Sequence, residues 1–435
     1  MKILSLLFSL LLALDLSAAI IYCSPSGGGS GADFNNLATL PDTTGFTRGN
    51  TYVCIEGNYG SKNLSTALSG TTTITIRKAN AEDSAVAGYA TTLFDAVASF
   101  GSFTLTTGYW IVDGITRTET AGWAAPAGYG FSSTQITSNS GSSQDGSNSQ
   151  LRYIDIGAAY AENPSDATID DYGEAVYLVF NQQSISFTRC AIHNGQPALV
   201  QLTGSDFITF DHCEIGPGWG KAAIRGGNGS LLTDLIIKHC KFWNSSLKDP
   251  NDPTSGTTAE IAVWSWTGTS SGTEIYGNWF FSDRSSGRNS AIVVGGNGGS
   301  WIGDGADGTL VYNNTFEGFS EDSSNGDIDL NGSSTVARNN LGYNLTGGGP
   351  LSISATTTSN NNYETSDPFV NAAAHNYHLS GALAGFSLGS PYNIDPDGVT
   401  RGVDATFDVG AYEFDEGGAG ASGTLTISGT LTIGP

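Results

Sequence analysis

A short pattern of residues recurs through the middle of this 435-residue chain. Each copy is a brief apolar run, then a Cys or Asn, one variable residue and a large apolar residue, as in "ITFDHCEI" and "TLVYNNTF". A second apolar run, such as "KAAIRGG" or "SAIVVGG", precedes each copy. The shortest steps between copies define the repeat, and the longer steps carry inserted loops. The anchors of the pattern are Cys190, Cys213, Cys240, Asn278, Asn314, Asn339 and Asn361.

The length of the repeat decides what kind of unit it can be. Two strands and a shorter third fit into about 22 to 27 residues, whereas a repeat that contains a helix would need longer apolar stretches. Stacked coils of this size pair each strand with its equivalent one turn on, in parallel and about 4.8 Å apart. The sequence therefore predicts an all-β parallel β-helix, a solenoid whose coils bury their apolar faces only against one another. The predicted interior column consists of Ile192, Ile215, Phe242, Phe280, Phe316 and Leu341.

Charge and cysteine content narrow the function classes. The formal net charge of −24 argues against binding to nucleic acid, because a polyanion would need a local basic groove. The chain has five cysteines, so they cannot all pair with one another. For the three in successive repeats we expect buried thiols. Cys23 and Cys54 lie on two early strand-like runs, and we leave open whether they form a disulfide or are separately buried.

Both ends of the chain differ from the repeats. Residues 1–19 have an early lysine, an apolar run and small residues suited to cleavage before Ile20, which predicts a secretory signal peptide and an extracellular or cell-surface protein. This run is too short to span a membrane, and no later segment could do so. Residues 415–435 form a Gly-rich linker followed by "GTLTIS" and "GTLTIG". Such strand-like repeats can add to another sheet edge, so self-association is one interpretation, and a mobile terminus or an extra hairpin is the other.

Two further stretches carry a family resemblance. "RGNTYVCIEGNYG" with "TTTITIRKAN" resembles the opening of secreted β-helix proteins and of some polysaccharide lyases, and "DPFVNAAAHNYHLSG" begins a stretch similar to the closing segment of secreted bacterial β-helix proteins. Over roughly residues 50 to 365 the chain resembles the right-handed parallel β-helix proteins of the pectate-lyase-like superfamily. The resemblance implies right-handed winding, an N-terminal cap with the first coils in 20–105, the β-helix in 106–365 and a closing segment in 366–414. This fold hosts lyases, hydrolases, epimerases and adhesins, so it does not select a chemistry.

Strand alternation predicts one decorated outer wall. If Ala222 and Ile224 point inward, Lys221 and Arg225 point outward. The same register in neighbouring repeats places further polar and aromatic side chains on this wall: Glu260, Trp264, Trp266, Asp327, Asp329 and Asn331. Flat aromatic rings and carboxylates together are typical of a glycan groove. The competing interpretations are an ordinary charged surface for the cations and packing beneath an insertion for the tryptophans.

The chemistry of this wall fits β-elimination of a uronic acid polymer. Arg225 would hold the substrate carboxylate, Lys221 would act as the base and Glu260 is the catalytic carboxylate candidate, while Trp264, Trp266 and Asn331 would bind substrate. The resemblance adds Ca²⁺ on acidic rungs, for which Asp327 and Asp329 are the candidate ligands. A glycoside hydrolase would instead use these two aspartates as its carboxylate pair. Three histidines flank the cysteine anchors, and we expect turn-edge positions for them rather than a zinc site: His193, His212 and His239.

We therefore expect a secreted protein that interacts with an extracellular polysaccharide. If it is an enzyme, lyase activity on a uronic-acid-containing glycan is favoured over hydrolysis. The alternative is a non-catalytic glycan-binding adhesin or a structural surface or fibre protein.

Overall fold

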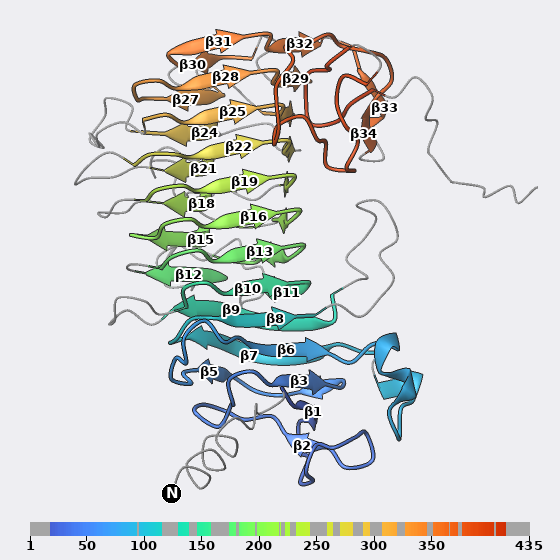
Figure 1. The fold of residues 1–435 in the computed structure, drawn as a ribbon. Helices are drawn as coiled ribbons and strands as arrows, with labels where there is room; N and C mark the ends of the chain where they lie inside the picture. The colour runs from blue at the N-terminus through green and yellow to red at the C-terminus, as the bar shows by residue number, and fades with distance from the viewer. Residues whose placement is uncertain are drawn as a thin grey trace, which may run out of the picture.

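The fold was analysed in a computed structural model of the chain. It describes residues 18–93, 95–114, 129–138, 146–157, 174–179, 182–195, 198–216, 218, 222–226, 232–243, 259–263, 270–281, 290–295, 307–319, 327–345, 351–364, 366–372, 376–403 and 406–414. Figure 1 shows a tall stack of coils, with the N-terminal strands at one end and a closing segment beside the coils at the other. The predicted signal peptide and tail lie almost wholly outside the described residues.

The first of three columns of strands is a 13-stranded parallel sheet. Its strands follow one another along the stack, each from the next coil: β2 (Ala38–Thr39), β1 (Ile20–Ser24), β3 (Thr51–Cys54), β6 (Ile74–Lys78), β8 (Trp110–Asp113), β10 (Gln150–Arg152), β13 (Ser186–Thr188), β16 (Thr209–Asp211), β19 (Ile236–Lys238), β22 (Glu274–Tyr276), β25 (Leu310–Tyr312), β28 (Val336–Arg338) and β31 (Thr357–Ser359). We call this sheet column one.

Columns two and three complete each coil. Column two consists of β11 (Ile154–Gly157), β14 (Ala191–His193), β17 (Glu214–Ile215), β20 (Lys241–Trp243), β23 (Trp279–Phe281), β26 (Thr315–Glu317), β29 (Leu341–Tyr343) and β32 (Asn362–Glu364). Column three consists of β12 (Val176–Val179), β15 (Ala198–Thr203), β18 (Ala222–Gly226), β21 (Ala259–Val263), β24 (Ser290–Val294), β27 (Ile328–Leu330) and β30 (Ile353–Ser354). Every pairing between these coils is parallel, which confirms the all-β parallel solenoid.

The lowest coils use longer strands. Strand β9 (Phe131–Ser138) pairs with β11 at its start and with β12 near its end, so one strand serves columns two and three. The same arrangement continues downward through β7 (Ala98–Leu105), β4 (Gly57–Asn58) and β5 (Lys62–Leu64), with the short 3-10 helices η1 (Ala81–Ala85) and η2 (Thr91–Leu93) between them in sequence. Among the described helices, none has the length and hydropathy that a membrane crossing requires.

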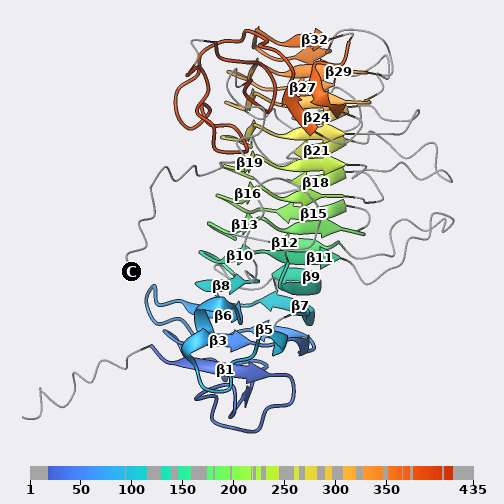
Figure 2. The same cartoon turned by 90° about the vertical axis from the view of Figure 1, so that its right-hand side faces the viewer.

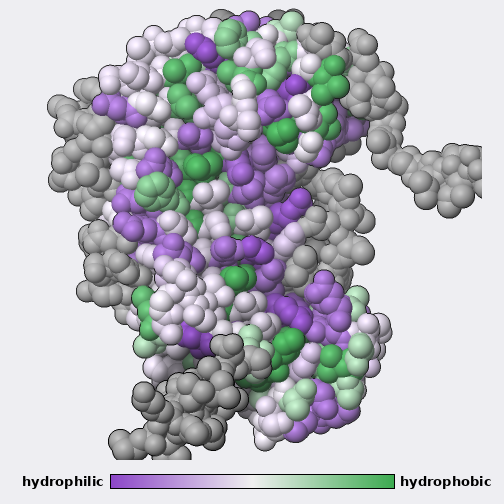
Figure 3. All heavy atoms as spheres, in the orientation of Figure 1, coloured by the Kyte–Doolittle hydropathy of each residue, from purple (hydrophilic) through white to green (hydrophobic). Residues whose placement is uncertain are grey.

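Equivalent apolar side chains stack inside the solenoid. In column two, Ile192, Ile215, Phe242, Phe280 and Phe316 follow one another in register, as predicted, and all are fully buried. The Phe242 and Phe280 rings stack with centroids 4.7 Å apart, and the next pair lies at 4.9 Å. This spacing equals the strand separation, so each coil gives its neighbours a matching ring. On the face shown in Figure 3, hydrophilic side chains are interspersed with isolated hydrophobic ones.

The prediction that Leu341 continues this column is wrong by one residue. Gly342 pairs with Phe316, and Leu341 pairs with Thr315. Leu341 instead belongs to a second apolar cluster, which includes Tyr377 and Val409 of the closing segment. The shift arises at the preceding "NN", where Asn339 takes φ +56° at the turn and Asn340 takes the anchor position. Asn tolerates positive φ, so either asparagine of the pair suited the pattern.

The anchors form a hydrogen-bonded ladder inside the turn between columns one and two. The Asn314 side chain accepts hydrogen bonds from the backbone N–H and the side chain of Asn278, both at 3.0 Å, and donates to the Ile275 carbonyl at 2.9 Å. Asn340 repeats this pattern one coil on, with Asn361 as its acceptor. Cys213 takes the same place lower down, where its Sγ donates to the Phe187 carbonyl at 3.5 Å. The ladder thus satisfies backbone groups that each turn leaves unpaired.

All five cysteines are buried free thiols. Cys23 and Cys54 are register partners on β1 and β3, but they are not bonded. Burial raises the pKa of the Cys23 thiol to about 12, so this thiol stays protonated at neutral pH.

The closing segment folds back along the outside of the upper coils, as Figures 1 and 2 show. It contains the antiparallel pair β33 (Phe369–Asn371) and β34 (Asn376–Leu379). The Tyr392 ring packs edge-on against Tyr276 and Tyr312 of column one, and the Ala411 N–H donates to the Thr315 hydroxyl. The segment therefore covers the turns between columns one and two over several coils.

Replacing Asn314 with alanine should lower the free energy of unfolding by about 2 to 4 kcal/mol, because the Ile275 carbonyl and the Asn278 N–H lose their partner in the interior. Asn314→Cys should lose less, since cysteine occupies this position in lower coils. Chemical denaturation measures both, with exposed Asn35→Ala as control. An Asn314→Ala loss no larger than that of the control would contradict the ladder.

Candidate functional site

The predicted outer wall is only partly within the described residues. Lys221, Trp264 and Trp266 lie outside them, so their proposed roles stay predictions. Arg225 lies half-buried on β18, in register with Gln201 and Ala262 of the neighbouring coils.

Glu260 does not lie on an accessible wall, because its exposed fraction is 0%. The prediction assumed strict alternation along β18 and β21, which is wrong at this corner of the coil. Ala222 packs in a small apolar cluster with Ala259, Ala262 and Val293, whereas Ala223 belongs to the main core. Glu260 occupies the register position of Ala223. A side chain buried in this way cannot contact a polymer at the surface.

The predicted calcium ligands are also buried. Asp327 is 2% exposed and accepts a hydrogen bond from the Ser352 N–H at 3.0 Å. Asp329 is 6% exposed and accepts one from the Asn331 amide, while burial raises the pKa of its carboxyl. Ca²⁺ takes six to eight oxygen ligands and favours ionised carboxylates. Among the described His, Cys, Asp and Glu side chains, no third one joins this pair, so calcium binding by the two aspartates stays a prediction.

Polar side chains gather instead on the outer face of column two. Glu214 on β17 and Lys241 on β20 are register partners. Burial lowers the pKa of Lys241 to about 8, although Glu214 and Asp397 oppose the shift. Burial also raises the pKa of Glu214. This strand face therefore carries an amine that is partly neutral near physiological pH, which is unusual for lysine.

The closing segment supplies the other side of this site. The His378 ring on β34 bonds to the Asp397 carboxylate through Nε2, and this hydrogen bond raises the pKa of His378. Asp397 interacts electrostatically with Lys241, and Lys241 with His378, so these side chains are neighbours in space. The His378 side chain is 48% exposed. We call Glu214, Lys241, His378 and Asp397 the lysine site.

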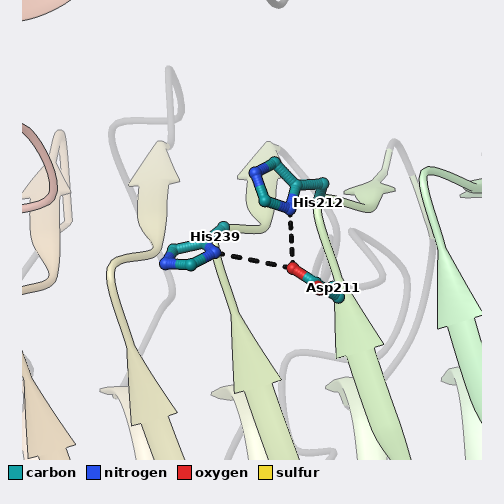
Figure 4. A group of neighbouring side chains, drawn as sticks. All are labelled: Asp211, His212 and His239. Atoms are coloured by element: carbon teal, nitrogen blue, oxygen red, sulfur yellow. Dashed lines mark hydrogen bonds and ion pairs between the residues drawn. The ribbon is translucent and has the colours of Figure 1, made fainter. Parts of the chain in front are cut away.

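Three side chains at the adjacent turns form the histidine cluster of Asp211, His212 and His239 (Figure 4). The Asp211 carboxylate lies 2.6 Å from His212 Nδ1 and 3.5 Å from His239 Nδ1. Burial alone would raise the pKa of Asp211, but the hydrogen-bonded His212 imidazole and the neighbouring His239 imidazole outweigh it and hold that pKa well below its usual value. His212 Nε2 lies 2.8 Å from the Pro396 carbonyl, which connects the cluster to the closing segment beside Asp397.

An aromatic row follows the lysine site along the same outer face. Trp243 lies two residues after Lys241 on β20 and is 40% exposed. Phe281 pairs with Trp243 one coil on, and Tyr343 lies two coils further in the same register, with Glu317 between them. Phe281 and Tyr343 are half-buried and pack against Trp279 and Phe369, so Trp243 is the ring of this row that offers an exposed stacking surface.

The lysine site and the aromatic row were missed from the sequence, although one signal was present. The residues on both sides of the cysteine anchors in "FDHCEIG" and "IKHCKFW" are charged or titratable in two successive repeats. The partners from the closing segment carried no such signal, since their approach depends on how that segment folds back.

The comparisons with known proteins do not indicate which reaction, if any, this site carries out. No family model matches the chain, and no curated protein matches it. A structure described as the crystal structure of pectate lyase Pel9A aligns with 92% of this chain and 97% of its own, at 12% sequence identity and a TM-score of 0.49. A likeness this distant bears on no residue of the lysine site.

Replacing Glu214 with glutamine should lower the pKa of Lys241 below about 8, because it removes a negative charge that opposes the effect of burial. A ¹³C NMR titration of reductively methylated lysines measures the shift. Glu274→Gln, on column one, is the control. A rise in the Lys241 pKa, or a change equal to that of the control, would contradict the described neighbourhood.

Proposed function

We propose that the protein binds an extracellular polysaccharide along the aromatic row and cleaves it by β-elimination at the lysine site. The single observation that carries the proposal is Lys241, a lysine with a pKa of about 8 beside the exposed ring of Trp243. The predicted signal peptide supports an extracellular substrate.

Lys241 has the properties of the base. A neutral amine takes the proton from C5 of a uronic acid, the C–H electron pair forms the C4=C5 double bond, and the C4–O bond breaks toward the leaving oxygen. An ordinary lysine is almost wholly protonated at neutral pH, whereas at a pKa of about 8 roughly a tenth is neutral at pH 7. Partial burial thus makes the base available.

Two further side chains fit the remaining steps. His378 is protonated more readily than an ordinary histidine because of Asp397, so it is the group that returns a proton to the leaving oxygen. Lys238, in the same coil, is the cation assigned to the substrate carboxylate, and its ammonium lies 3.3 Å from Asp211. Arg225 remains a proposed second contact on the face of column three.

Binding would depend on the aromatic row. Sugar rings present C–H faces that stack on Trp243, and the half-buried Phe281 lies one coil further along the same face. The row begins two residues from Lys241, so a polymer that follows it passes the base.

The assay for the reaction is incubation with alginate, pectate or chondroitin, followed by ultraviolet absorbance of the unsaturated product. Lys241→Ala and Lys241→Arg should both lower the rate at least 100-fold, because alanine has no base and a guanidinium does not lose its proton. Each variant should keep glycan affinity. New reducing ends without unsaturated product would indicate hydrolysis, and binding without either product would indicate a non-catalytic glycan-binding protein.

Trp243→Ala should weaken binding of the cleaved polymer about tenfold, equivalent to ~1.4 kcal/mol, with little change in kcat. Phe207→Ala removes another exposed aromatic, 53% exposed on the side of column one, and should leave affinity unchanged. Isothermal titration calorimetry with Lys241→Arg as the background measures both. Equal losses for the two variants would refute a specific role for the aromatic row.

A further inference from the structure

The histidine cluster is built from equivalent positions of two successive coils. Asp211 ends β16 and His212 follows it at φ +54°, while His239 follows β19 at the same φ. The two histidines therefore stack one coil apart, with ring centroids 4.8 Å apart, and both face the carboxylate that ends the first strand. Among the described residues, this is the one group of three His, Cys, Asp or Glu side chains whose potential ligand atoms all lie within 4.8 Å of one another.

His239 is the observation that points to a ligand. Its exposed fraction is 7%, and neither Nδ1 nor Nε2 has a hydrogen-bond partner. Nδ1 faces Asp211 Oδ1 at 3.5 Å, beyond the length of a good hydrogen bond. Buried imidazole nitrogens are normally paired, so this ring requires a partner that the protein groups do not supply.

The spacing suits a tetrahedral metal ion. Two ligand atoms, each about 2.1 Å from zinc, stand about 3.4 Å apart, which is close to the separation of His239 Nδ1 and Asp211 Oδ1. His212 Nδ1 lies 2.6 Å from the same oxygen and would have to move outward by less than 1 Å. Lys238 contacts the other carboxylate oxygen, Oδ2, and so leaves Oδ1 directed at the imidazoles.

The outer contact of His212 has the form found around metal-bound histidines. When Nδ1 binds a metal, the other ring N–H commonly donates to a carbonyl or carboxylate, which fixes the tautomer. His212 Nε2 lies 2.8 Å from the Pro396 carbonyl of the closing segment. The same ring thus joins the cluster to the closing segment.

We propose that Asp211, His212 and His239 bind one zinc ion and that this ion fastens the closing segment to the coils. Two imidazoles and one carboxylate select zinc and its transition-metal neighbours over Ca²⁺, which prefers oxygen ligands alone. Three protein ligands leave the fourth zinc position for water. The zinc ligands do not include the proposed base or the aromatic row, although Asp211 also pairs with Lys238, the cation proposed to hold the substrate carboxylate.

The test uses the full chain without a polyhistidine tag, stripped with a chelator and titrated with Zn²⁺ against a chromogenic competitor. We expect one ion per chain, and at least tenfold weaker binding in His239→Gln and Asp211→Asn. His193→Ala is the matched control, because His193 pairs with Asp155 at a similar strand end and should leave affinity unchanged. Zn²⁺ should also raise the Tm of the wild type, and Ca²⁺ should not.

Co²⁺ gives a readout that does not depend on variants. Substitution into the stripped wild-type protein should give the intense visible absorption of a four-coordinate ion. Folded wild-type protein that binds far less than one Zn²⁺, or variants that bind as tightly as the control, would overturn the proposal. Loss of zinc binding with lyase activity retained would leave the lyase proposal standing, and the reverse result would leave the zinc site standing.

Discussion

The structure depends on one constraint: each coil must provide hydrogen-bond partners for the backbone groups that are buried in its turn between columns one and two. The residue before the anchor takes a positive φ, and the anchor side chain then reaches the backbone of the coil before it, as Asn314 does with Ile275. In the lower coils thiols take this place and in the upper coils amides do. Because the turn is fixed, the strands on both sides keep their register, and the apolar residues stack at the strand spacing.

The same constraint determines where the side chains of the candidate site lie. A fixed turn directs the residues beside it outward in every coil, so His212 and His239 stack, as do Glu214 and Lys241. The closing segment covers the upper part of this line, and its Pro396 and Asp397 lie beside His212 and Lys241. Burial lowers the pKa of Lys241, and the buried ring nitrogens of His239 have no hydrogen-bond partner. The proposed base and the proposed metal site therefore both lie beside the closing segment.

The fold could be read from the sequence because stacking repeats a chemical pattern. The interior column from Ile192 to Phe316 followed directly from spacing, and it failed only at Leu341, where consecutive asparagines allowed two registers. The outer wall was less predictable. Strict alternation placed Glu260 outside, but Glu260 is fully buried, and Ala223, its equivalent one coil earlier, belongs to the main core. The lysine site needed Asp397 from a distant segment, and no local pattern specifies how that segment docks.

A crystal structure of the Lys241→Arg variant with a bound uronic acid tetrasaccharide tests the central claim most directly. We expect one sugar ring stacked on Trp243 and the C5 atom of the next ring within about 4 Å of the side chain at position 241, since a base must reach the proton that it removes. Sugar bound only on the face of column three near Arg225, with the column-two face empty, would contradict it.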